Sequence, residues 1–162
     1  MIISLGELEK VRKHNKAQTI VFAGGVFDVF HTTHVRTFKK LRTYGDIVVI
    51  GVVSDKRVRE RKGPGRPVLT QKERCEIVDA IRYVDFVVQM PTPTKSEPVP
   101  TLAILKKLRP NIFVSVDRNW MNYTYVIDEL GIRLKIVKRI HPISSTSIIE
   151  RVLRKHKETS GR

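Results

Sequence analysis

The chain has 162 residues with 31 Lys and Arg against 16 Asp and Glu, which gives a formal net charge of +15. This length and a hydrophobic content of 41% exclude a disordered chain and suit a single domain over residues 1–162. The sequence has no long apolar run and no signal-peptide pattern, so we expect a cytoplasmic protein without membrane contact. The one cysteine, Cys75, excludes an intrachain disulfide framework and is expected to be a buried structural thiol.

The high positive charge attracts polyanions, so nucleic acid competes as a partner with any small anionic ligand. The Lys and Arg residues are nevertheless dispersed along the chain, and aromatic residues that would stack on bases are few and scattered. The basic cluster over residues 151–157 is explained by a solvated helix face. We therefore do not expect nucleic acid to be the specific partner.

In chain order, the pattern first predicts a short amphipathic helix over residues 4–16, with Ser4 as N-cap and Glu7 completing a capping box. Five short, apolar and β-branched segments follow, which is typical of strands covered on both faces. These predicted strands are residues 19–23, 47–53, 86–89, 112–116 and 134–137.

Helical spacing lies between the strands, and Gly45 and Gly131 supply helix stop signals. The predicted helices are residues 35–43, 71–81, 101–108, 123–130 and 145–156. Two segments, residues 57–67 and 91–100, are rich in proline and are predicted to be loops that connect elements or cover a ligand.

Strands that alternate with helices imply an α/β protein with a three-layer Rossmann-like fold, in which helices flank a mostly parallel five-stranded sheet. Ligands of such sheets bind at the carboxyl ends of the strands. Four segments come after predicted strands: the turn at residues 24–28, Ser54-Asp55, Asp117 and residues 144–147. From chain order alone, we expect these segments to meet at one edge of the sheet.

Residues 21–34, VFAGGVFDVFHTTH, join an apolar strand, a glycine turn and two histidines at the start of a helix. Glycines let the backbone approach a ligand closely, and the first turn of a helix attracts anions. His31 and His34 are spaced to face one side, where two imidazoles would donate hydrogen bonds to phosphate oxygens. A helix cap and a surface residue would be the simpler explanation of a histidine pair, but the strand, turn and helix favour a phosphate site.

This segment resembles the signature of the nucleotidyltransferase superfamily, G-x-F-D-x-x-H-x-G-H, whose members join a nucleoside triphosphate to a phosphorylated small molecule and release pyrophosphate. The resemblance implies that His31 and His34 are catalytic residues that contact the triphosphate. It also implies a nucleotide-binding turn made of Gly24, Gly25, Val26, Phe27 and Asp28, in which the aspartate braces the turn. Thr33 stands where the signature has glycine, and its side chain would either crowd the nucleotide or supply an extra hydroxyl.

Residues 58–68, VRERKGPGRPV, are similar to the V-R-x-x-K-G-x-G-R-P-V segment in the nucleotidyltransferase domain of ADP-heptose synthases. By this resemblance Lys62 is a third catalytic residue that closes over the phosphates, with Arg61 and Arg66 as helpers. A merely solvated basic loop is the alternative. Arg74 matches an arginine that related enzymes keep, and it either binds phosphate or pairs with a carboxylate.

Residues 143–149, ISSTSII, resemble the I-S-T-T-K-I and C-S-T-T-N-I-I segments of glycerol-3-phosphate cytidylyltransferases and ADP-heptose synthases. The resemblance implies that hydroxyl and N–H groups there hold the β- and γ-phosphates. The residues concerned are Ser144, Ser145, Thr146 and Ser147. Arg139 has a counterpart in the cytidylyltransferases, and Asp117 is similar to an aspartate that touches the nucleoside in archaeal FAD synthases, although the neighbouring glycines are missing.

Together these resemblances imply transfer of AMP from ATP to a phosphorylated sugar such as heptose 1-phosphate, with Mg²⁺ bridging the triphosphate. The sequence assigns no metal ligands, and a homodimer is an expectation from relatives alone. Two alternatives keep the fold: a cytidylyltransferase that uses CTP with a polyol phosphate such as glycerol 3-phosphate, and an FAD synthase that uses ATP with FMN. A third alternative, motivated by Thr33 and the charge, is a nucleotide or RNA binder without turnover.

Overall fold

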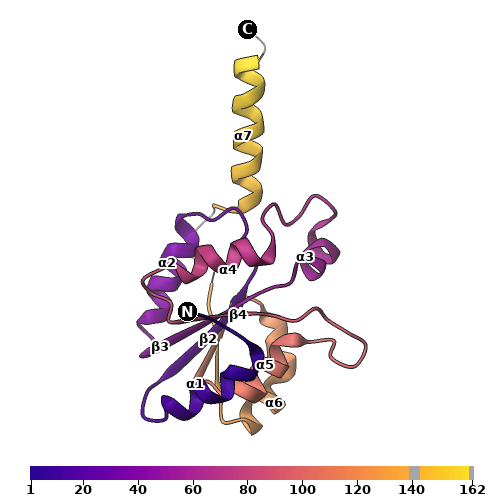
Figure 1. The fold of residues 1–162 in the computed structure, drawn as a ribbon. Coiled ribbons are helices and arrows are strands. Elements are labelled where there is room, and N and C mark those ends of the chain that lie inside the picture. Colours follow the sequence, from indigo (N-terminus) through magenta and orange to yellow (C-terminus); the bar gives the residue numbers. More distant parts are fainter. Residues whose placement is uncertain (139–142, 161–162) are drawn as a thin grey trace.

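A parallel β-sheet forms the centre of the computed structural model, which describes residues 1–138 and 143–160 (Figure 1). The strands follow the order β1-β4-β3-β2-β5-β6, and every adjacent pair is parallel. Their bounds are β1 (Ile2–Ile3), β2 (Ile20–Gly25), β3 (Ile47–Val52), β4 (Phe86–Gln89), β5 (Ile112–Ser115) and β6 (Arg133–Ile136). The predicted α/β class and parallel sheet are confirmed.

The sheet has one strand more than the sequence predicted. This additional strand, β1, has two residues and pairs with β4 through Ile2 and Val87 at the edge of the sheet. Two residues are too short to give an alternating or continuous apolar pattern, so β1 carries no strand signal of its own.

The helices alternate with the strands as predicted, apart from their ends and one segment. Their bounds are α1 (Leu8–His14), α2 (Thr32–Arg42), α3 (Asp55–Lys62), α4 (Gln71–Asp79), α5 (Pro100–Leu108), α6 (Thr124–Glu129) and α7 (Ser145–Ser160), with short 3-10 helices η1 (Leu5–Glu7) and η2 (Arg118–Tyr123). At the first helix, the predicted capping box of Ser4 and Glu7 is present.

The prediction that residues 57–67 form a loop is wrong for their first half. Helix α3 runs through residues 55–62, because the Ser54 hydroxyl accepts the N–H of Arg57 and caps the helix. Gly63 ends it with a φ of 93°, a conformation that glycine adopts without strain. The glycine and proline residues that suggested a loop all lie beyond this point.

Two hydrophobic clusters fill the space between the sheet and its two helix layers. Phe22 of β2 belongs to the cluster beneath α1, α5 and α6, while the adjacent Val21 belongs to the cluster beneath α2 and α4. This alternation places helices on both faces of the sheet (Figure 1). Cys75 of α4 is fully buried, as predicted, and burial raises the pKa of its thiol to about 11.

The chain order reverses at β2, and this reversal positions the site. From β2 the sheet grows through β3 and β4 on one side, and then through β5 and β6 on the other. A parallel sheet opens a crevice for ligands at the carboxyl ends of the strands where the order reverses. The crevice therefore lies beyond Gly25, at the end of β2.

Candidate active site

A phenylalanine ring that folds back over a glycine shapes the end of β2. A Cβ atom on Gly25 would lie 2.5 to 2.9 Å from ring atoms of Phe27, so a larger residue does not fit there. Phe27 and Val29 have φ values of 55° and 43°, which are uncommon for residues other than glycine. Such strain persists where the surrounding structure holds it, and it clusters at ligand sites. We call residues 26–34 the histidine turn.

Asp28 holds the histidine turn to the end of the basic segment, residues 57–67. Its carboxylate is 1% exposed and accepts the N–H groups of Val68 at 3.0 Å and Leu69 at 3.1 Å, and Nε of Arg66 at 2.8 Å. Burial by itself would raise the pKa of Asp28, but these hydrogen bonds and the Arg66 charge outweigh it and leave the pKa below its ordinary value. Asp28 is thus an ionised brace and not a proton acceptor.

The two histidines stack on each other at the start of α2. His31 occupies the N-cap position and His34 the third helical position, with ring centroids 4.0 Å apart and planes 28° apart. The backbone N–H of His31 donates to Nδ1 of His34 at 3.4 Å. Phe27 packs edge-on against the His34 ring, with centroids 5.4 Å apart. Packing and capping therefore fix both imidazoles at the N-terminus of α2.

Both histidines are set to be neutral donors. Burial, reinforced by the positive charges of His31 and Lys62, lowers the pKa of His34 to about 4, and burial lowers the pKa of His31. Since Nδ1 of neutral His34 accepts a hydrogen bond, its proton belongs on Nε2. Nδ1 of His31 is buried and has no partner among the described residues. The pair offers hydrogen-bonding groups to a ligand without offering positive charge.

The lowered pKa of His34 predicts a loss of stability in mild acid. The unfolded chain takes up a proton at the ordinary pKa of 6.5, whereas the folded chain does so only near 4. The contribution of His34 to stability is therefore complete above pH 6.5 and falls as the pH drops from 6.5 to 4. Melting temperatures of wild type and His34→Gln at pH 7.5 and 5.0 measure this effect, and the variant should lose less stability. His156→Gln, at an exposed position on α7, should behave as wild type, and equal acid losses in all three proteins would contradict the prediction.

Lys62 is the lysine whose positive charge acts on His34. It lies in the last turn of α3, and its charge contributes to the lowered pKa of His34. Its side chain is exposed. The structure thus brings the three predicted catalytic residues to one edge of the sheet.

Three contacts dock the segment that begins α7 on the histidine turn and on Arg66 of the basic segment, and we call them the docking contacts. Buried Ser145 donates its hydroxyl to the Asp28 carbonyl, and Nη1 of Arg66 donates to Oγ1 of Thr146 at 3.4 Å. Oγ1 of Thr33 donates to the Ile143 carbonyl at 3.3 Å. The N-termini of α2 and α7 therefore converge, and with them the positive ends of two helix dipoles.

The four hydroxyls of residues 144–147 are all engaged within the protein. Ser144 and Ser147 cap the helix reciprocally: Ser144 Oγ accepts the N–H of Ser147 at 3.1 Å, and Ser147 Oγ accepts the N–H of Ser144 at 3.0 Å. Ser145 and Thr146 make docking contacts. Among the described residues, the backbone N–H groups of Ser145 and Thr146 have no acceptor, so they are the groups that this helix end offers to an anion.

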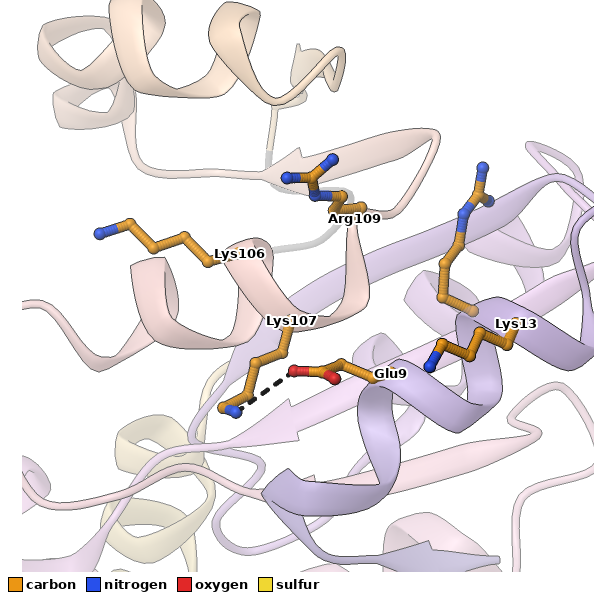
Figure 2. Close-up of a pocket in the computed structure, with 6 residues that line it drawn as sticks. Glu9, Lys13, Lys106, Lys107 and Arg109 are labelled. Carbon is orange, nitrogen blue, oxygen red and sulfur yellow. Dashed lines mark hydrogen bonds and ion pairs between the residues drawn. The ribbon is translucent and has the colours of Figure 1, made fainter.

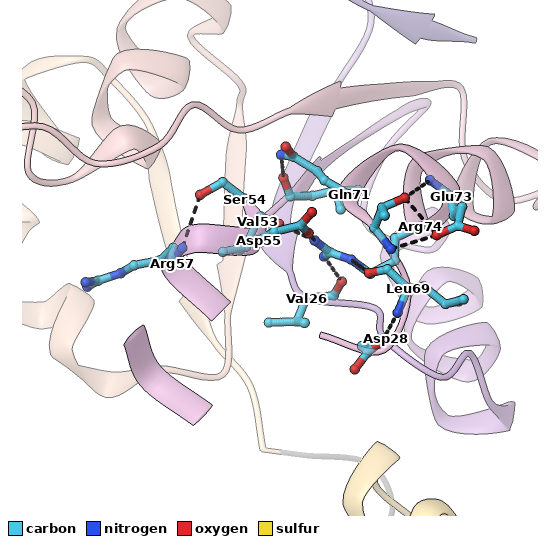
Figure 3. Close-up of polar contacts among 12 residues, drawn as sticks. Val26, Asp28, Val53, Ser54, Asp55, Arg57, Leu69, Gln71, Glu73 and Arg74 are labelled. Atoms are coloured by element: carbon cyan, nitrogen blue, oxygen red, sulfur yellow. Dashed lines mark hydrogen bonds and ion pairs between the residues drawn. The ribbon is translucent and has the colours of Figure 1, made fainter. Parts of the chain in front are cut away.

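Arg74 pairs with a carboxylate, which was the second of the two roles that its motif allowed. It is fully buried, and Nη2 lies 2.6 Å from Oδ1 of Asp55 (Figure 3). The guanidinium also donates to three backbone carbonyls: Leu69 at 3.0 Å, Val53 at 2.8 Å and Val26. Arg74 therefore ties the end of β3, the start of α3 and Leu69 to Val26 of the histidine turn, and its full burial keeps it out of reach of a ligand.

Two more residues, Asp117 and Arg139, were predicted to bind the nucleotide. Asp117 follows β5, next to β2, but its carboxylate accepts the N–H of Asn119 at 3.0 Å and caps η2. Arg139 lies outside the described residues.

Sequence reasoning missed Gln71, whose Nε2 donates to the Val52 carbonyl at 2.8 Å and the Met90 carbonyl at 2.9 Å. Its position at the start of a predicted helix gave no signal of this bridge between β3 and β4.

Comparison with known proteins identifies the family. The family model described as cytidylyltransferase-like matches residues 22–151, from β2 into α7. The chain belongs to the cytidylyltransferase-like family. It is an enzyme of the nucleotidyltransferase type.

Curated relatives match almost the whole chain. "Bifunctional protein HldE" of Syntrophotalea carbinolica is 34% identical over 155 residues, which cover 93% of this chain and 30% of that protein. The protein of the same name from Campylobacter fetus is 34% identical over 151 residues, covering 93% of this chain and 31% of the relative. The chain thus spans about a third or less of the length of these relatives.

Solved structures confirm the fold. A lipopolysaccharide core biosynthesis protein from Thermoplasma volcanium aligns with a TM-score of 0.61 at 24% identity, covering 75% of this chain and 96% of that one. A pantoate-beta-alanine ligase from Francisella tularensis aligns with a TM-score of 0.59 at 14% identity, covering 92% and 75% of the two chains. At these sequence identities, the similarity shows a shared fold only.

The described side chains of this cytidylyltransferase-like domain do not form a cage for Mg²⁺. Within residues 1–138 and 143–160, no three His, Cys, Asp or Glu side chains gather as metal ligands. The carboxylate at the histidine turn, Asp28, is already occupied by two N–H groups and Arg66. Mg²⁺ commonly keeps several waters and binds through substrate phosphates, so it does not require such a cage of protein ligands.

A second concentration of positive charge lies on α1 and α5, at the opposite, amino edge of the sheet. A hollow of about 280 Å³ is lined by Glu9, Arg12, Lys13, Lys106, Lys107 and Arg109 (Figure 2). In that lining Glu9 is the one carboxylate, and it pairs with Lys107 at 3.5 Å. Arg12 donates to Oδ1 of Asn111, which also accepts the N–H of Ile20 at the start of β2. Part of the net charge thus lies well away from the histidine turn.

Of the helices in the described part of the chain, none has both the length and the apolar character to cross a membrane.

Proposed function

We propose that this chain transfers AMP from ATP to a phosphorylated sugar such as heptose 1-phosphate and releases pyrophosphate. The observation that carries the proposal is the convergence of the stacked His31–His34 pair, the N-termini of α2 and α7, and Lys62 at the crevice where the strand order reverses. Similarity to the HldE relatives and the resemblance of the basic segment to ADP-heptose synthases support the choice of ATP and a sugar phosphate.

The proposed reaction is an in-line displacement at the α-phosphorus. An oxygen of the acceptor phosphate forms the new bond to phosphorus, the bond to the bridging oxygen breaks, and the electron pair leaves on pyrophosphate. The reaction needs no protein nucleophile, only alignment and stabilisation of charge on the phosphate oxygens. In this proposal, Nε2–H of His34 donates to the triphosphate, the helix N-termini hold its oxygens, and Lys62 supplies the positive charge that the neutral histidines lack.

Pyrophosphate release with each of the four nucleoside triphosphates and Mg²⁺ tests the proposal, crossed against sugar 1-phosphates, glycerol 3-phosphate and FMN. The expected result is turnover confined to ATP with a sugar 1-phosphate, abolished in His31→Ala. Turnover with CTP and glycerol 3-phosphate, or with ATP and FMN, would replace this substrate assignment by one of the alternatives. Nucleotide binding without turnover, and with a steep salt dependence, would indicate a non-catalytic binder.

The proposed role of Lys62 predicts a loss of activity without a loss of stability. Lys62→Ala should lower kcat by about 10- to 100-fold, because one cationic contact to the transition state is lost. Since Lys62 is exposed at the end of α3, the melting temperature of the Lys62→Ala variant should stay close to that of wild type. Lys56→Ala, an exposed lysine at the other end of α3, is the matched control and should keep full activity. Equal kcat values for the two variants would remove Lys62 from the mechanism.

A further inference from the structure

Thr33 makes a contact that a glycine at its position cannot make. It is the second residue of α2, between the two histidines, and it is half-buried. Its Oγ1 donates to the Ile143 carbonyl at 3.3 Å, across 110 positions of the chain. The superfamily signature has glycine there, which has no donor on its side chain. The Thr33 side chain is thus directed at the segment that enters α7.

Helix α7 depends on its first turn for its position. From Glu150 onward, every described residue of α7 is exposed, and Figure 1 shows the helix standing away from the rest of the molecule. Ser145 is its one buried residue within the described part. The docking contacts, together with the half-buried residues 147–149, therefore set where the N-terminus of α7 lies. One of the three, the Thr33 contact, holds the residue immediately before the Ser144 cap.

We propose that Thr33 is a positioning residue that holds the N-terminus of α7 over the histidine turn and thereby sets the affinity of the site for the nucleoside triphosphate. The backbone N–H groups of Ser145 and Thr146, which have no acceptor among the described residues, lie on the helix end that Thr33 restrains. A restrained helix end meets the phosphates without a further ordering cost, so the contact acts on binding. The histidine pair is held separately, by its own stacking and by the His31 N–H, so the chemical step should change little.

This inference rests on the proposed function, and it predicts a change in KM with little change in kcat. Thr33→Val keeps the shape of the side chain and removes the donor. The contact is long for a hydroxyl hydrogen bond, so we expect a rise of about 3- to 10-fold in the dissociation constant for MgATP and in KM. Thr33→Ser should stay near wild type, and Thr33→Gly should behave as Thr33→Val.

Thr37→Val is the matched control. Thr37 lies one turn further along α2, and its hydroxyl donates to the Thr33 carbonyl at 2.9 Å, within the helix and away from α7. Both valine variants thus lose one hydroxyl from the same helix, but only Thr33→Val loses a docking contact. Equal effects of the two variants on MgATP binding would overturn the proposal, as would tighter binding or faster turnover in Thr33→Gly.

Amide hydrogen exchange of residues 144–148 without nucleotide separates this inference from the proposed function. Thr33→Val should raise exchange there, whereas Thr37→Val should not, because freeing the helix end exposes its amides more often. Wild type that fails to bind any nucleoside triphosphate would refute the proposed function, while faster exchange would still support the positioning of α7 by Thr33. Unchanged exchange together with unchanged MgATP binding would refute the positioning role alone.

Discussion

Replacing His34 by alanine is expected to lower kcat by about 100- to 1,000-fold, the cost of removing one preorganised donor from a charged transition state. The His34 ring is fixed on three sides, by the stacked His31, by Phe27 and by Phe30 at 5.2 Å. Its proton lies on Nε2 because Nδ1 accepts the His31 N–H. Steady-state pyrophosphate release and direct MgATP binding together measure the effect, which should fall mainly on kcat.

The stacked arrangement also predicts that the two histidines do not act independently. His31→Ala removes both an imidazole and the face against which His34 packs, so the double variant should lose less than the product of the two single losses. His156→Ala on α7 controls for the loss of a histidine elsewhere, and circular dichroism controls for folding. A His34→Ala enzyme with kcat within twofold of wild type would place the chemistry elsewhere.

Because the histidines are neutral, we expect charge and hydrogen-bond direction to come from different groups at the site. A cationic imidazole would attract the triphosphate by charge, but with a pKa of about 4, His34 cannot carry that charge at neutral pH in the free enzyme. In the proposed mechanism, Lys62 and the converging N-termini of α2 and α7 would attract the triphosphate, and the histidines would orient it through hydrogen bonds. This division agrees with a reaction in which both substrates are polyanions.

The parts of the fold that the sequence predicted are those with local signals. The strand at residues 20–25 begins as an apolar run and ends in two glycines, which were predicted to start the turn and instead complete the strand. Chain order then determines which strand ends meet at one edge, so the convergence of the histidine turn with residues 144–147 could be inferred before any contact was known. Strand β1 had no such signal because two residues are too short to form a pattern. The first half of the basic segment had none because its residues are almost all charged and show no apolar helical spacing.

The pairings within the site could not be predicted, because they depend on residues far apart in the chain. Asp28 meets Arg66 across 38 positions, and Ser145 meets the Asp28 carbonyl across 117. Sequence analysis gave Arg66 a role at the phosphates and gave residues 144–147 free hydroxyls, whereas both are engaged in holding the loops together. A motif identifies which residues gather, but it does not say which of them touch the ligand and which hold the others.

Arg74 provides the largest expected effect on stability. Arg74→Met replaces a fully buried guanidinium by an apolar side chain of similar length, which leaves Asp55 unpaired and three carbonyls without their donors. Breaking a buried pair in this way costs about 3–5 kcal/mol. For a chain of this size, such a loss lowers the melting temperature by roughly 10 °C. Thermal unfolding followed by circular dichroism measures the shift.

Arg74→Lys separates charge from geometry at the same position. A lysine keeps the positive charge near Asp55, but a single ammonium group cannot reach acceptors in three separate loops, so most of the destabilisation should remain. Arg57→Met is the matched control, because its pairing with Glu60 is exposed on both sides and should contribute less than about 0.5 kcal/mol. If Arg74→Lys has the melting temperature of wild type, a positive charge at this position is enough to hold the segments that Arg74 contacts. If Arg74→Met also has the melting temperature of wild type, Asp28 and its partners hold the histidine turn without a contribution from Arg74.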